Sequence, residues 1–210
     1  MSGSGQVRAE SPGSYGAAMR WYEAEAAAGN ARAQYLLGLS LEQGARGPVD
    51  PAGAARWYEK AAAQGLADAQ LKLALALQFG RGVAADPAQA RAWYEKAARQ
   101  GLPEAAYNLA YLQESGLGGP VQPAKAISNY EQAARGGIGR AYMALGGVYA
   151  RGLESVAQDL PAAYSWLILA VDAGQPGAET LLEAVGAELT DVQRAEARAG
   201  AKKWRDKPLS

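Results

Sequence analysis

The apolar positions of the chain recur with a period of 36 residues. A Trp-Tyr pair stands at 21–22, 57–58 and 93–94, and Asn129-Tyr130 follows after the same step. Two glycine series and an Asp-Pro series keep this register, which indicates an internal repeat rather than chance. Their members are Gly29, Gly65, Gly101, Gly137 and Gly174; Gly44, Gly80, Gly116 and Gly152; and Asp50-Pro51 and Asp86-Pro87.

Each repeat is predicted to fold as two helices. In the second full unit, Asp86 is suited to the N-cap and Pro87 to the first helical position, where its missing N–H costs nothing. Residues 88–100 are rich in helix formers, and Gly101 can adopt the left-handed conformation that ends a helix. A further helix is expected from Pro103 to Ser115, so successive helices form helical hairpins.

Two-helix units of this size cannot bury their apolar faces alone and must stack on one another. The sequence therefore predicts an all-α fold, an α/α superhelical solenoid of about eleven helices. It begins with a half unit at Tyr15–Ala28, and the extra residue of the last unit falls in the loop before Asp159. A terminal helix follows Leu189, where Thr190 and Gln193 form a capping-box signature. We divide the chain into a leader at 1–13, the solenoid at 14–188, and a capping helix and tail at 189–210.

Small residues recur beside leucines and predict close helix packing. Gly38, Ala74, Ala110 and Gly146 occupy one position of the repeat, each directly after a leucine. A small residue lets two helix backbones approach, and the leucine fills the space beside it. Trp57 and Trp93 are expected to fill the layer between successive units.

These residues together resemble the Sel1-like repeat, a relative of the tetratricopeptide repeat, over about Tyr15 to Ala187. The resemblance implies the same solenoid. The chain departs from the repeat at Asn129, which replaces Trp, and in the fourth unit, where Trp166 starts a more apolar helix segment. In the first full unit the motif is carried by Ala33, Tyr35, Leu37, Gly38, Leu41 and Gly44, then Asp50, Pro51, Ala54, Trp57, Tyr58, Lys60, Ala61, Ala62 and Gly65.

In the tetratricopeptide fold the first helix of each pair lines the concave surface, and the resemblance implies the same here. Candidate partner-binding residues follow at equivalent positions, with Arg32, Glu42 and Gln43 beside them. The alternative for the Tyr35 series is packing between helices, and Gly147 is expected to flatten the groove. The eight candidates are Tyr35, Leu39, Leu71, Leu75, Phe79, Tyr107, Tyr111 and Met143.

Composition removes several classes of function. The 21 Lys+Arg balance the 21 Asp+Glu, so the basic excess of a nucleic-acid binder is missing. With no Cys and no His, the chain has no thiolate or imidazole chemistry and no Cys/His zinc site. The acidic residues are interpreted as helix caps or solvated positions. We therefore expect no enzymatic activity, no cofactor and no metal site. No stretch approaches the roughly 20 apolar residues that span a bilayer.

The expected function is therefore non-enzymatic binding of another protein, as a scaffold or adaptor. The alternative within protein binding is a bacterial immunity protein that inhibits a cognate toxic effector; the Ala/Gly/Arg-rich usage favours a bacterial origin. Small-molecule binding in the groove and self-association through the apolar stripe remain open. The MSGSG start resembles an artificial leader. The compartment is therefore unknown: periplasmic if that leader replaced a native signal, otherwise cytoplasmic.

Overall fold

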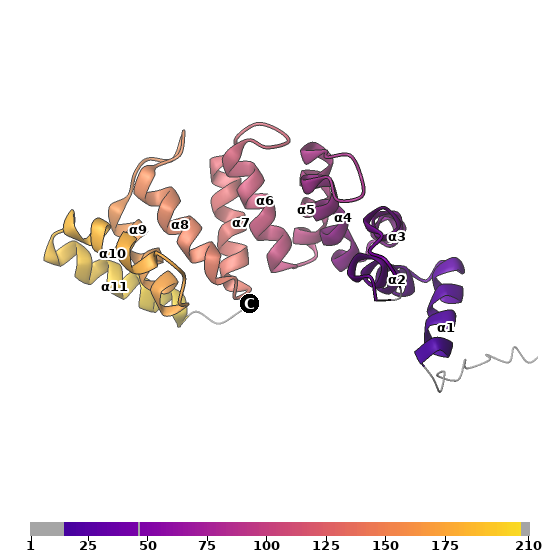
Figure 1. The fold of residues 1–210 in the computed structure, drawn as a ribbon. Coiled ribbons are helices and arrows are strands. Elements are labelled where there is room, and N and C mark those ends of the chain that lie inside the picture. The colour runs from indigo at the N-terminus through magenta and orange to yellow at the C-terminus, as the bar shows by residue number, and fades with distance from the viewer. Residues whose placement is uncertain (1–14, 46, 207–210) are drawn as a thin grey trace, which may run out of the picture.

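The computed structural model describes residues 15–45 and 47–206, and these residues form eleven α-helices. This confirms the predicted all-α solenoid. Figure 1 shows the helices in chain order along one curved row, from α1 at one end to α10 and α11 at the other. The predicted leader at 1–13 and the last four residues lie outside the described residues. The helices are α1 (Tyr15–Ala27), α2 (Ala31–Gln43), α3 (Pro51–Ala63), α4 (Ala67–Phe79), α5 (Pro87–Arg99), α6 (Pro103–Ser115), α7 (Pro123–Arg135), α8 (Gly139–Arg151), α9 (Leu160–Asp172), α10 (Ala178–Ala187) and α11 (Asp191–Arg205).

Local signals fix where the helices begin and end. The Asp50 carboxylate accepts a hydrogen bond from the Gly53 N–H at 2.8 Å, and Asp86 and Asp159 cap α5 and α9 in the same way. The first helix of a unit ends on a glycine with positive φ, which is 67° at Gly80. An L side chain is disfavoured in this conformation, so glycine is needed there.

The core runs along the row because the helices from α1 to α10 pack mainly on their neighbours in the chain. The predicted small positions are buried, with Ala74 and Ala110 both fully enclosed. At Gly38 an added Cβ would lie 2.6 Å from the Tyr58 ring, so glycine is what lets α3 approach α2. The prediction that small residues allow close packing is confirmed at this position.

In three successive repeats, tyrosine rather than the residue before it is the fully buried aromatic residue. Tyr58, Tyr94 and Tyr130 are 2%, 0% and 1% exposed. Trp57 and Trp93 are half-buried and pack against the edge of the core, each with a lysine ammonium over its ring. The expectation that tryptophan fills the layer between units is therefore corrected. On a helix, adjacent residues point about 100° apart, and the Trp-Tyr pair alone does not say which ring faces inward.

Loops tie each unit to the one before it. Gly82 lies between α4 and α5, and an added Cβ there would come within 2.2 Å of the Pro51 backbone at the start of α3. Gly118, one repeat later, approaches Pro87 at 2.3 Å in the same way. The loops therefore pack on the first turn of the preceding second helix.

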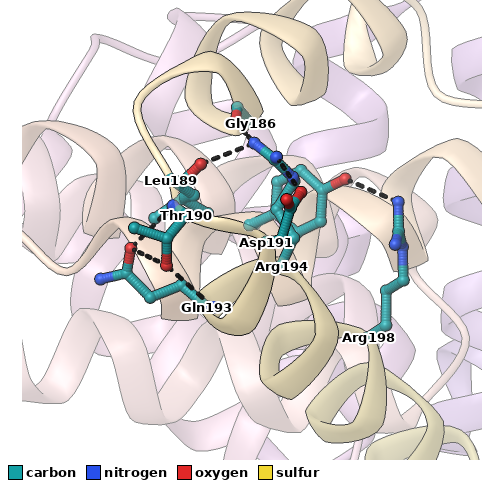
Figure 2. A network of polar contacts seen from close by, with 8 residues as sticks. Gly186, Leu189, Thr190, Asp191, Gln193, Arg194 and Arg198 are labelled. Carbon is teal, nitrogen blue, oxygen red and sulfur yellow. Dashed lines mark hydrogen bonds and ion pairs between the residues drawn. The ribbon is translucent and has the colours of Figure 1, made fainter.

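The C-terminal helices are held by a polar network (Figure 2). Thr190 and Gln193 form the predicted capping box of α11. The Arg194 guanidinium donates to the carbonyls of Gly186 and Leu189, both at 2.6 Å, and so joins α11 to the end of α10. α11 packs mainly on α9, where the Trp166 and Trp204 rings meet edge to face.

Within the described part of the chain, none of the helices has the length and apolar character that crossing a bilayer requires.

Candidate functional site

The eight candidate residues all lie on the first helices of successive units. We call their surface the first-helix face: Tyr35 and Leu39 on α2, Leu71, Leu75 and Phe79 on α4, Tyr107 and Tyr111 on α6, and Met143 on α8.

Two of the eight are exposed and six are half-buried. Phe79 is 56% exposed and Tyr111 is 46% exposed, which is unusual for large apolar side chains in this chain. Tyr35 packs on the Tyr58 ring, with centroids 5.9 Å apart, and Tyr107 packs on Tyr130 at 5.5 Å. The half-buried members therefore contribute to the core as well as to the surface, as the alternative interpretation of the Tyr35 series anticipated.

A first cavity of about 460 Å³ lies between the C-terminal halves of α2 and α4 and one side of α3. Its walls are mostly apolar and include the candidate residue Leu75, together with Val49 and Ala54. Three charged residues also line it, namely Glu42, Lys72 and Arg81. The cavity is therefore an apolar pocket with a charged rim.

The Glu42 carboxylate is held at the rim of this first cavity by hydrogen bonds. It accepts hydrogen bonds from the Tyr58 hydroxyl at 2.8 Å and the Lys72 ammonium at 2.7 Å. Burial raises the pKa of Glu42, but these hydrogen bonds and the charges of Lys72 and Arg81 outweigh it and hold the pKa below its usual value. Glu42 is therefore ionised and paired at neutral pH.

A second cavity of about 320 Å³ lies two units further along the first-helix face, between α6, α8 and α10. The candidate residues Tyr107 and Met143 line it, and Leu181 of α10 lines it as well. Arg151 reaches across from α8 to the Glu114 carboxylate at 2.8 Å, and its guanidinium lies against Gly147. Gly147 therefore makes room for an arginine at the place where a flat groove was expected.

The charged residues of these cavities were largely missed by sequence reasoning. Glu42 was placed beside the stripe, but its partners Lys72 and Arg81 were not, nor were Arg140 and Arg151. The available signal was the equivalence of Glu42 and Glu114, which are two repeats apart, each 16 residues before a buried tyrosine.

A further hollow of about 540 Å³ lies between the second-helix side of α7 and the turn before α6. Ser128, Glu131, Gln132 and Arg135 line it, and it holds none of the candidate residues. We therefore place the candidate site on the first-helix face.

The buried polar side chains of the core form hydrogen bonds that connect neighbouring helices. The buried Gln70 amide donates to the Ala62 carbonyl and accepts from Gln100, and Gln34 repeats this arrangement one unit earlier with Gln64. No buried side-chain polar atom among the described residues lacks a partner, and these residues contain no cluster of acidic side chains fit to hold a metal.

Comparison with known proteins places the repeats in a family. The Sel1 repeat model matches residues 31–66, 67–102, 103–138 and 139–175. A solved structure of a protective antigen of uropathogenic Escherichia coli with an SLR fold is 32% identical, with a TM-score of 0.79 over 90% of this chain; the match spans 40% of the antigen's length. A Sel1 repeat protein from Oxalobacter formigenes is 30% identical, with a TM-score of 0.75 over 90% of this chain and 79% of its own.

The search of curated proteins gave no match. Sel1 repeats typically mediate protein–protein interaction and are generally non-enzymatic. The four matched repeats contain all of the helices α2 to α9, including their buried tyrosines. This chain belongs to the Sel1 repeat family.

Proposed function

We propose that this chain is a non-enzymatic interaction module that holds a partner protein on the first-helix face. In this proposal the first-helix face is the concave surface of the solenoid. The observation that carries the proposal is the exposure of Phe79 and Tyr111 on a face that also has two cavities. Aromatic side chains are enriched at protein interfaces and often dominate their binding energy. A scaffold or adaptor role fits such a surface.

Variants of the two exposed aromatic residues test the proposal. Tyr111→Ala and Phe79→Ala should each weaken binding about tenfold or more, because each removes a large apolar contact. Both side chains are about half exposed, so the fold should tolerate their loss. The measurement is quantitative pull-down from native lysate followed by titration with the purified partner.

Val192→Ala is the matched control, because Val192 is 67% exposed and lies on α11, away from the first-helix face. A partner that bound both aromatic variants as tightly as wild type would overturn the assignment of the face.

The identity of the captured protein distinguishes the adaptor role from inhibition of a toxic effector, which is the second role the resemblance allows. A toxic enzyme whose activity is lost on binding would indicate inhibition, and its dissociation constant should then lie at the tight end of the scale. A component of a signalling or envelope-assembly pathway would indicate an adaptor.

A further inference from the structure

Two arginines beside the first-helix face form no ion pair with an acid, although the charge of Arg81 does help to lower the pKa of Glu42. The Arg81 guanidinium lies over the Phe79 ring, 5.1 Å from its centroid, and Arg140 lies over Tyr107 at 4.2 Å. Both arginines are exposed, and no described residue forms an ion pair with either one. Stacking on a ring fixes the guanidinium plane while leaving its N–H donors free for another group.

Each arginine lies at one of the two cavities of the first-helix face. Arg81 lines the first cavity and Arg140 lines the second. The acid of the first cavity, Glu42, is occupied by Tyr58 and Lys72.

The acid of the second cavity is occupied as well. Glu114 accepts hydrogen bonds from the Tyr130 hydroxyl at 2.7 Å and from Arg151 at 2.8 Å. Each cavity rim therefore has two cations and one anion, a surplus of one positive charge. The whole chain is neutral, so this surplus is a local property of the two rims.

The repeat places the acid of each rim at the same position. Glu42 and Glu114 are equivalent residues two repeats apart, and the tyrosines that donate to them are equivalent as well. In the intervening unit the equivalent position is Gln78, which accepts from the Tyr94 hydroxyl at 2.6 Å. The repeat therefore fixes the positions of the two acids, whereas the cations of the rims, Lys72 and Arg81 in the first and Arg140 and Arg151 in the second, stand at positions of the repeat that are not equivalent.

We propose that the two cavities bind two acidic side chains of one extended partner segment, each next to an apolar side chain that fills the cavity. Each stacked arginine donates to a partner carboxylate, and a charge-assisted pair of this kind is among the stronger hydrogen bonds available to a protein. Leu75 and Met143 supply the apolar walls. The inference rests on the proposed function, since it names the chemistry of the partner bound on the same face.

The test is selection of peptides from a random 16-residue phage library on the intact protein. Four consecutive helix contacts of 8–10 Å place the two cavities at most roughly 40 Å apart, and 16 extended residues reach roughly 50 Å. Selected peptides should be enriched in two acidic residues, each beside a large apolar residue. Their affinity should fall with rising salt, because exposed charge pairs are screened.

Affinity is then measured on four variants. Arg81→Gln and Arg140→Gln should each weaken binding about tenfold, the typical loss for a hydrogen bond to a charged group, and the double variant should weaken it further. Arg56→Gln is the matched control, since Arg56 is exposed on α3 and lies outside both cavities. Circular dichroism checks that all four variants remain folded.

The outcomes separate this inference from the proposed function. Peptides without acidic residues, unaffected by the arginine variants but lost in Tyr111→Ala, would overturn the inference and leave the proposed function standing. Sensitivity to only one arginine would overturn the two-anchor arrangement. Peptides insensitive to the arginine variants and to Tyr111→Ala, or no enriched peptide at all, would count against both.

Discussion

Asn129 occupies the position that carries tryptophan in the preceding units, and its contact explains the change. Its amide nitrogen donates to the Gln113 carbonyl oxygen at 2.8 Å. Gln113 is 5% exposed, so its side-chain oxygen would otherwise be buried without a partner. Asn129 and Gln113 therefore form a matched polar pair between α6 and α7.

The pair gives a prediction for single and double variants. Asn129→Ala should destabilise the protein by about 1–3 kcal/mol, because a buried acceptor loses its donor. Asn129→Leu combined with Gln113→Leu should recover much of that loss, since both polar partners are replaced together. Urea unfolding measures the free energies, and Ser128→Ala, at an exposed position of α7, is the control. Equal stability of Asn129→Ala and wild type would mean that water satisfies Gln113.

At the scale of the elements, loops pack successive helical hairpins against one another. Gly82 and Gly118 let a loop lie directly on the first turn of the preceding second helix, and both have positive φ, 74° and 73°. Gly101 has a similar φ of 86° but no neighbouring atom within 4 Å of an added Cβ. Comparing Gly82 and Gly118 with Gly101 therefore separates the cost of a positive φ from the cost of a close approach to a neighbouring backbone.

Gly82→Ala should cost more stability than Gly101→Ala. Both changes incur the penalty of the left-handed conformation, roughly 1–2 kcal/mol, but only at Gly82 does the new Cβ meet backbone atoms, at 2.2 Å from Pro51. Overpacking of this kind adds about 1–3 kcal/mol. Chemical denaturation of the two variants side by side gives the difference. If the two losses were the same, the loop contact would not stabilise the solenoid.

Buried tyrosines make the stability of the folded array depend on pH. Burial raises the pKa of Tyr58, Tyr94 and Tyr130 far above the usual value near 10, and at Tyr58 and Tyr130 the hydrogen-bonded carboxylates raise the pKa further. These tyrosines lie in three successive units that contact one another in chain order. A raised pKa stabilises the folded state below pH 10, and this contribution is lost as the pH rises through the folded-state values.

The array should therefore unfold in alkali before these tyrosines ionise in place. Above pH 10, ultraviolet absorbance of the buried tyrosinates should appear together with the loss of helical circular dichroism, in one transition. Tyr94→Phe should remove part of the pH dependence, because that group no longer titrates, while Tyr22, half-buried near the start of the row, serves as the site for a control Tyr22→Phe. Ionisation of all tyrosines with the helices intact would contradict this expectation.

Local residue choices determined the repeat length, the two-helix unit and the helix ends, because N-caps, positive-φ glycines and helix formers act within a few residues of themselves. The placement of the eight candidate residues on the first helices followed from the same register. Which aromatic ring is buried, how far Phe79 and Tyr111 are exposed, and which charges meet at each cavity rim depended on the rotation between units. That rotation is set by side chains of different units packing together. Only the tertiary structure could place Lys72 and Arg81 beside Glu42, since a helix and a loop of one unit meet a helix of the unit before it.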